Sequence, residues 1–187
     1  GMKTSVVLLT RHDTASRQAY LHARDALNKL LDFGVVPIVN ENDTTSVEEI
    51  KFGDNDTLSA IVACLVKADH TVIFSDVKGL YDANPNVDPD AKLIPHVDRI
   101  TESILGIAGG AGSKVGSGGM ITKIRAARVL MIAGLPMTLC EGHEPDALAR
   151  IARGEAVGTL FRANSKPHEI TGYKLWIALG DAAKGTI

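Results

Sequence analysis

Cysteines and basic clusters are scarce in this sequence, and each scarcity argues against a class of protein. The two cysteines, Cys64 and Cys140, form no CxxC motif and have no histidine at metal-ligand spacing. We therefore expect reduced core thiols and a cytoplasmic location. The net charge is −2 and no basic run occurs, which argues against a nucleic-acid-binding protein.

Membrane and metal signals are missing as well. The apolar runs at residues 60–66 and 129–136 are far shorter than the about 20 residues that cross a bilayer. No extended apolar stretch follows Gly1-Met2-Lys3, so we expect no secretory leader. The six histidines form no HxxxH or HExxH pair, so we expect no metal site built from histidines.

What is present is an alternation of short β-rich runs and helical patterns. Apolar residues make up 45% of the 187-residue chain, enough for one substantial domain with some length left over. Asp13 and Thr14 are plausible caps for the first helix, and Gly34 and Gly134 are typical helix stops. The expected strands cover residues 5–10, 35–40, 71–75, 93–97 and 136–140, and the expected helices cover 13–33, 57–67, 101–108, 120–133 and 147–153. This order predicts an α/β fold with a mostly parallel sheet sandwiched between helices.

The character of the chain changes after Phe161. Residues 162–172 are polar, contain a proline and show no periodicity, which is typical of a linker. We therefore predict one domain over residues 2–162, followed by a linker and the start of a second unit over 163–187.

Polar clusters occur where expected strands end and helices begin, which is where open α/β sheets bind ligands. Residues 40–43 (Asn-Glu-Asn-Asp) follow a strand and could accept an ammonium or donate to a carboxylate, although such residues also favour plain turns. Asp54, Asn55 and Asp56 precede a helix. Asp56 or Asn55 could cap that helix, but three polar residues in succession exceed what capping requires.

A glycine-rich turn over residues 116–123 is the third junction. Its small residues would let backbone N–H groups approach phosphate oxygens at a helix N-terminus. Lys123 would lie in the first turn of that helix, where the dipole disfavours a cation unless an anion is also present. The pattern matches neither the P-loop nor GxGxxG. At a fourth junction, Asp76 could orient a cation or a ribose hydroxyl, or simply start a turn.

Five colinear segments resemble the glutamate 5-kinases, a branch of the amino acid kinase family. The resemblance extends over residues 5–161, without large gaps. Together the five segments are highly specific for this family, whereas any one of them alone would not be. They are residues 34–43 (GVVPIVNEND), 52–56 (FGDND), 76–85 (DVKGLYDANP), 116–123 (GSGGMITK) and 158–161 (GTLF).

The resemblance implies an activity and its partners. It implies transfer of the γ-phosphate of ATP, with Mg²⁺, to the side-chain carboxylate of L-glutamate. The product would be the acyl phosphate that enters proline biosynthesis. Proline is then a candidate feedback inhibitor, and the enzyme is expected to be a homo-oligomer.

The resemblance also implies a role for each motif residue. The glutamate would be held by Asn40, Asp43, Asp54 and Asn55. Asp56 would hold catalytic lysines in position, and Lys123 would neutralise charge on the migrating phosphoryl group. Ser75 and Asp76 would face the nucleotide, and the segment that wraps it would comprise Ser117, Gly118, Gly119, Met120, Ile121, Thr122 and Lys123.

The sequence departs from the family at both ends. The family opens with a strand and a Gly/Ser-rich turn that carries another phosphate-binding lysine, and this sequence starts after them. Residues 173–187 resemble the approach to the family's C-terminal PUA domain. We therefore expect little kinase activity from this chain alone, and self-association through an exposed sheet edge. The alternatives are another kinase of the family (acetylglutamate, aspartate or uridylate), a non-catalytic module that binds glutamate or proline, and a purely structural fragment.

Overall fold

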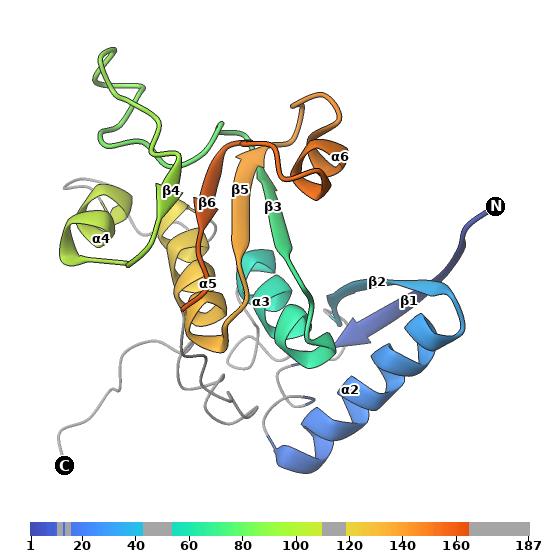
Figure 1. The fold of residues 1–187 in the computed structure, drawn as a ribbon. Coiled ribbons are helices and arrows are strands. Elements are labelled where there is room, and N and C mark those ends of the chain that lie inside the picture. Colours follow the sequence, from blue (N-terminus) through green and yellow to red (C-terminus); the bar gives the residue numbers. More distant parts are fainter. Residues whose placement is uncertain (11–12, 14–15, 43–53, 110–118, 165–187) are drawn as a thin grey trace, which may run out of the picture.

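The computed structural model describes residues 1–10, 13, 16–42, 54–109 and 119–164. Helices and strands largely alternate along it, as the sequence predicted, except that β4 follows β3 and α5 follows α4 (Figure 1). The helices are α2 (Arg17–Asp32), α3 (Asn55–Val66), α4 (Glu102–Gly109), α5 (Met120–Ala133) and α6 (Ala147–Ala152). The strands are β1 (Lys3–Leu9), β2 (Val35–Glu41), β3 (Thr71–Ser75), β4 (His96–Val97), β5 (Met137–Glu141) and β6 (Thr159–Phe161).

The described strands form two sheets. Strands β1 and β2 pair in parallel, and the other four lie in the order β3-β5-β6-β4. Pairs β3–β5 and β4–β6 are parallel, whereas β5–β6 is antiparallel. The predicted α/β class with mostly parallel pairing is confirmed. The division into two sheets was not predicted.

Strand β6 was not predicted, because three residues are too short to show a periodicity. It is nevertheless fully enclosed between β5 and β4, and Thr159 and Phe161 are completely buried. The hydroxyl of Thr159 accepts a hydrogen bond from the N–H of Leu80 (2.8 Å) and donates one to the carbonyl of Ile94 (2.7 Å). This hydroxyl therefore ties the turn-rich segment after β3 to the sheet.

The start of α2 differs from the prediction. Ser16 caps α2 by accepting the N–H of Ala19 at 3.1 Å. Asp13 instead accepts hydrogen bonds from the N–H and hydroxyl of Thr10, and Thr14 lies outside the described residues. The end of α5 is as predicted, because Gly134 has φ +82° and closes the helix in the left-handed conformation.

Helix α3 is the central packing element. Leu58, Ile61 and Leu65 pack in one cluster with Leu27 of α2 and Val129 of α5. Its alanines pack in a second cluster with β3, β5 and α5. Because α3 is covered on several sides, it is apolar around most of its circumference.

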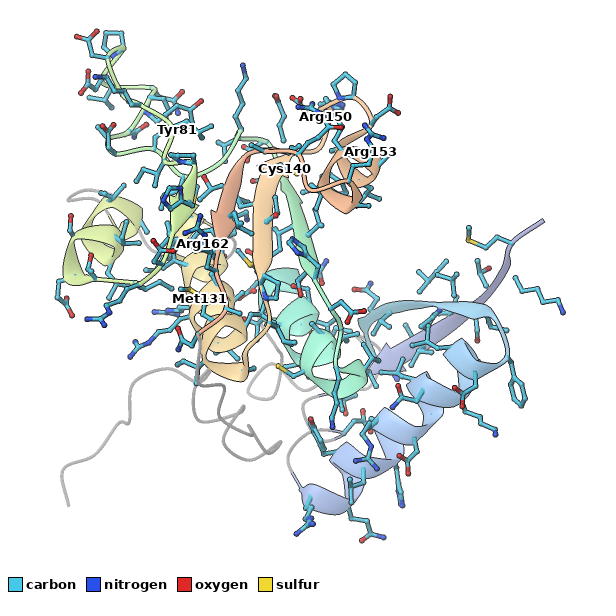
Figure 2. All side chains as sticks on the ribbon, in the orientation of Figure 1. Tyr81, Met131, Cys140, Arg150, Arg153 and Arg162 are labelled. Atoms are coloured by element: carbon cyan, nitrogen blue, oxygen red, sulfur yellow. The ribbon has the colours of Figure 1, made fainter. Side chains whose placement is uncertain are left out.

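The cysteines are core residues, as predicted. Both are free thiols, Cys140 buried in β5 (Figure 2) and Cys64 half-buried in α3. Burial raises the pKa of the Cys64 thiol to about 12. This thiol is therefore protonated at neutral pH and a poor nucleophile.

Two further findings concern the periphery. The described helices are all too short or too polar to cross a lipid bilayer. Around α6, Arg150 pairs with Glu144 before the helix and with Glu155 after it, and Arg153 also pairs with Glu155; both arginines lie at the surface (Figure 2). Surface pairs of this kind contribute little to stability.

His70 should make the stability pH-dependent. Its Nε2 lies 2.9 Å from the hydroxyl of Thr138, and burial lowers its pKa from the ordinary 6.5. Below about pH 6.5, His70 is protonated more fully in the unfolded chain than in the folded one. The free energy of unfolding should therefore fall as the pH falls below about 6.5. Urea denaturation at about pH 7.5 and about pH 5.5 measures this drop. The drop should be smaller in His70→Gln, and an equal drop in both proteins would contradict the assignment to His70.

Candidate functional site

The N-terminus of α3 presents three consecutive polar residues. Asp54 is the cap: its carboxylate accepts the N–H of Thr57 at 2.6 Å and the hydroxyl of Thr57 at 3.2 Å. The prediction that Asp56 or Asn55 caps this helix is therefore wrong. Asn55 is exposed on the first turn, whereas Asp56 is half-buried and directed at another helix. Because Asp54 does the capping, the side chains of Asn55 and Asp56 are available for other contacts.

The N-terminus of α5 supplies the partners of Asp56. The ammonium of Lys123 lies 3.1 Å from Asp56 Oδ2. The hydroxyl of Thr122 lies 2.6 Å from the same oxygen and 2.7 Å from the carbonyl of Gly119. The single hydroxyl proton of Thr122 can serve one of these two acceptors at a time. The carboxylate of Asp56 thus receives a cation and a neutral donor from two adjacent residues.

The packing of two helices explains why Asp56 and Lys123 meet although they are 67 positions apart in the sequence. Helices α3 and α5 pack against each other. Small side chains in their shared cluster, Ala60, Ala63, Ala126 and Ala127, permit a close approach. The polar first turns of both helices then lie at the same end of the pair. The FGDND and GSGGMITK motifs meet there through their described residues.

The electrostatics of this meeting point are informative. The Lys123 and Asp56 side chains are 13% and 12% exposed, so water screens the pair weakly. Both helix N-termini carry partial positive charge, which favours anions. Lys123 adds a further positive charge there, and Asp56 offsets part of it. The described geometry therefore suits an anionic ligand near two helix N-termini.

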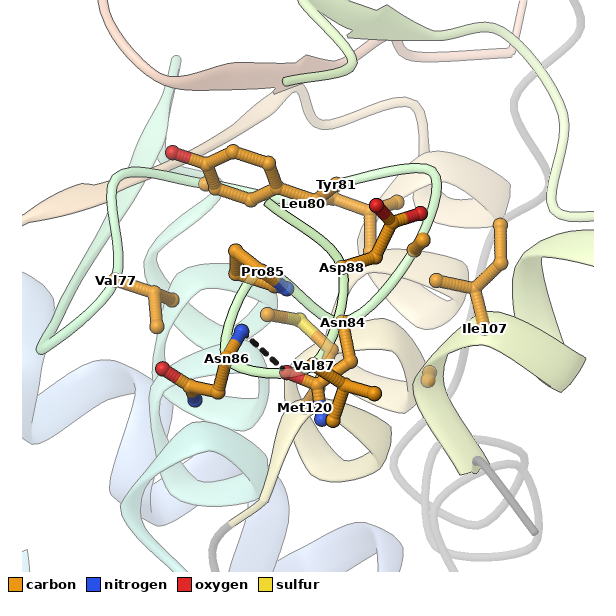
Figure 3. A pocket seen from close by; sticks show the side chains of 13 residues that line it. Val77, Leu80, Tyr81, Asn84, Pro85, Asn86, Val87, Asp88, Ile107 and Met120 are labelled. Carbon is orange, nitrogen blue, oxygen red and sulfur yellow. Dashed lines mark hydrogen bonds between the residues drawn. The ribbon is translucent and has the colours of Figure 1, made fainter. Parts of the chain in front are cut away.

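A cavity of about 740 Å³ lies next to the first turn of α5, which carries Lys123. Met120, the first residue of α5, lines it together with the segment that follows Ser75-Asp76 (Figure 3). The cavity is lined mainly by apolar groups and has a few polar ones, including Tyr81, Asn84 and Asp88. The side chain of Asn84 is held in place because its Oδ1 accepts the N–H of Asn86 at 3.0 Å. Size and lining suit a small organic ligand with a polar edge.

The remaining predicted site residues fall into two groups. Asn40 is exposed at the end of β2, and Ser75, at the end of β3, donates its hydroxyl to Asp76 Oδ1 at 3.0 Å. Asp43, Ser117 and Gly118 lie outside the described residues. Sequence reasoning missed the contact between Thr122 and Asp56. No periodicity could have signalled it, because it depends on how two helices pack.

Comparison with known proteins identifies the family. A family model described as "Amino acid kinase family" matches residues 1–140. The chain belongs to the amino acid kinase family. This match contains the α3 and α5 motifs that meet at Asp56 and Lys123.

Curated relatives in this family carry the name glutamate 5-kinase. The protein from Deinococcus radiodurans is 49% identical over 187 residues, which is 100% of this chain and 51% of the relative. The protein from Syntrophotalea carbinolica is 46% identical over 100% of this chain and 50% of its own length. The protein from Azoarcus is 51% identical over 95% of this chain and 47% of its own length. The chain thus spans about half the length of the curated relatives it matches.

Solved structures confirm the amino acid kinase fold. A UMP kinase from Bacillus anthracis superimposes with a TM-score of 0.56 at 16% identity, covering 87% of this chain and 59% of the other. An isopentenyl phosphate kinase substrate complex superimposes with a TM-score of 0.57 at 20% identity, covering 87% and 61%. At these identities the likeness concerns the fold.

Proposed function

We propose that this chain carries the nucleotide-binding part and a share of the glutamate-binding part of a glutamate 5-kinase. The reaction is transfer of the γ-phosphate of ATP to the side-chain carboxylate of L-glutamate, the first step of proline biosynthesis. The observation that carries the proposal is the contact between Lys123 and Asp56, which joins two family motifs at two helix N-termini. The identity of 44–51% to proteins named glutamate 5-kinase supports the choice of substrate.

Phosphoryl transfer needs positioned charge more than it needs covalent chemistry. In the proposal, the ammonium of Lys123 neutralises charge on the migrating phosphoryl group. Asp56 is a positioning residue: it receives both Lys123 and Thr122 and so fixes the direction of the lysine side chain. The N–H groups at the start of α5 would add donors to phosphate oxygens.

The glutamate would lie between the C-terminal end of β2 and the start of α3. Asn40, Asp43, Asp54 and Asn55 are the proposed ligands. The oxygens of Asp54 that accept hydrogen bonds from Thr57 have further lone pairs, so capping leaves them able to receive the substrate ammonium. Asn55 offers an exposed amide on the same helical turn.

The nucleotide would occupy the cavity beside Ser75, Asp76 and Met120. Within the described ranges, no group of three or more metal-ligating side chains is present. In kinase sites Mg²⁺ is held chiefly by substrate phosphate oxygens together with one or two protein carboxylates. The exposed carboxylate of Asp76 is the proposed protein ligand. Bound Mg²⁺ would supply charge neutralisation at the β- and γ-phosphates.

The remaining proposals rest on the sequence and on the family. We propose a cytoplasmic homo-oligomer with proline as a feedback inhibitor. The second candidate is a binding module that retains the glutamate or proline pocket without turnover.

Isothermal titration tests the ligand assignment. Mg-ADP and L-glutamate should each bind, whereas N-acetylglutamate, aspartate and UMP should not. ADP release measured in the same samples tests whether the bound glutamate is phosphorylated. Binding of UMP or acetylglutamate in place of glutamate would assign another kinase of the family. Absence of all binding would contradict the proposal, and proline or glutamate binding without ADP binding would support the module.

A further inference from the structure

One wall of the cavity beside the start of α5 is a single excursion of the chain. Residues 80–94 lie between β3 and β4 in the sequence and project beyond the end of the sheet (Figure 1). Most of residues 81–88 line the cavity (Figure 3), and α4 and α5 contribute Ile107, Ala108 and Met120 to the same lining. The shape of the cavity therefore depends on how segment 80–94 is held relative to these two helices.

The two arms of segment 80–94 are bonded to each other. The N–H of Ile94 donates to the carbonyl of Leu80 at 2.8 Å, and the N–H of Asp82 donates to the carbonyl of Lys92 at 3.0 Å. The carboxylate of Asp82 also accepts the N–H of Lys92 at 2.7 Å. The tip is open to water, since Val87 is 79% exposed. Because an exposed tip has little packing of its own, its position depends on how the two arms are anchored at their base.

A single hydroxyl anchors both arms at that base. Thr159 Oγ1 accepts the N–H of Leu80 from one arm and donates to the carbonyl of Ile94 on the other. Together with the bond between Ile94 and Leu80, these contacts form a closed ring of three hydrogen bonds. Thr159 is completely buried and Leu80 is 1% exposed, so water has little access to replace the bond between them. Thr159 is held in turn, because β6 lies between β5 and β4.

The fit between the hydroxyl and the start of the excursion is close. A Cβ added at Gly79 would lie 2.6 Å from Thr159 Oγ1 and 3.1 Å from the backbone nitrogen of Thr159. The absence of a side chain at Gly79 therefore lets the backbone approach β6 closely enough for the N–H of Leu80 to reach the hydroxyl. Gly79 and Leu80 both line the cavity. The hydroxyl thus fixes the wall where the excursion begins.

We propose that Thr159 is a positioning residue of the nucleotide site: through Leu80 and Ile94, its hydroxyl holds segment 80–94 at the distance from α4 and α5 that a bound nucleotide requires. The inference rests on the proposed function, because it takes the ligand of this cavity to be the nucleotide. Thr159 acts through the backbone of the two arms and not through contact with the ligand.

Removal of the hydroxyl should change which arrangements of the wall are populated. The buried N–H of Leu80 and the carbonyl of Ile94 would both lose this partner in the native arrangement. An unpaired buried polar group is costly, so displaced arrangements of segment 80–94 become more populated. The apparent dissociation constant of the nucleotide then rises by the factor by which the binding-competent population falls.

Titration calorimetry with Mg-ADP tests this role in the full chain. Thr159→Val keeps the branched shape but removes the hydroxyl, and it should weaken binding about fivefold or more, the effect of one unpaired buried polar group. Thr159→Ser keeps a donor and acceptor at the same position and should restore most of the affinity. Thr138→Val is the matched control, because Thr138 is a buried threonine of the adjacent strand β5 whose hydroxyl lies 2.9 Å from His70 Nε2. It should lower the urea midpoint but leave Mg-ADP affinity unchanged.

Amide hydrogen exchange without ligand measures the wall itself. In Thr159→Val the amides of Leu80, Asp82 and Ile94 should exchange faster, whereas in Thr138→Val they should keep the rates of the unaltered chain. Unchanged Mg-ADP affinity in Thr159→Val, or an equal loss in Thr138→Val, would overturn the proposal, as would a failure of Thr159→Ser to restore binding. If the unaltered chain bound no Mg-ADP, the proposed function would fail. Exchange would still decide whether Thr159 holds the wall: unchanged rates in Thr159→Val would overturn that, and faster rates would support it.

Discussion

Replacing Lys123 with methionine should weaken the binding of a non-hydrolysable Mg-ATP analogue by about tenfold to a hundredfold, the value of one charge-assisted hydrogen bond to the γ-phosphate. Methionine keeps most of the side-chain length but removes the ammonium. Of the two hydrogen-bond donors to Asp56 described above, the substitution removes the Lys123 ammonium and keeps the Thr122 hydroxyl. The free energy of unfolding should therefore fall by about 1–3 kcal/mol. Titration calorimetry and urea denaturation measure the two effects.

The double variant Asp56→Asn/Lys123→Met separates these effects. Removing the carboxylate together with the ammonium should recover most of the lost stability, because no uncompensated charge remains. Nucleotide affinity should stay low. Lys92→Met removes an exposed lysine and should change neither quantity. If the double variant regained affinity for the ATP analogue, Lys123 would act through stability and not through contact with phosphate.

Gly158→Ala should be the most destabilising small substitution in the described chain that we can identify. Gly158 has φ +60°, and an added Cβ would lie 2.1 Å from the carbonyl oxygen of Leu139 and 2.9 Å from that of Lys78. Both neighbours are backbone atoms, so relief requires β5 and β6 to move apart. Left-handed strain of roughly 1–2 kcal/mol adds to overpacking of about 1–3 kcal/mol or more. We expect a loss above about 3 kcal/mol.

Gly154→Ala is the matched control. Gly154 also has a positive φ, +79°, but nothing lies within 4 Å of an added Cβ. Its substitution should therefore cost the strain alone, roughly 1–2 kcal/mol. Urea denaturation midpoints of the two variants give the comparison. Similar midpoints would mean that the sheet yields easily around Gly158.

The sequence predicted the elements whose signals are local. Helix α5 ends at Gly134 as expected, because a glycine in the left-handed conformation terminates a helix whatever surrounds it. Helix caps were harder: Asp54, Asn55 and Asp56 are all good caps by residue type. Which one caps depends on where the chain enters the helix, and that is set by tertiary packing.

The site was predictable to the extent that it lies in motifs. The meeting of Asp56 with Lys123 follows from two family segments, and composition or periodicity could not have given it. The hydrogen bond from Thr122 to Asp56 depends on the side-chain geometry between α3 and α5, and only the structure shows it. The four-stranded sheet depends on β6, whose three residues obtain their strand conformation from β5 and β4 on either side.

The position of β6 constrains how the chain is assembled during translation. Among the described strands it is synthesised last, yet it occupies an interior place between β5 and β4. Until residue 161 has left the ribosome, β4 has no hydrogen-bonding neighbour within the described strands, and the turn-rich segment lacks its tie to Thr159. A nascent chain arrested before that point would expose unpaired backbone on β5, which makes it a natural client for chaperones.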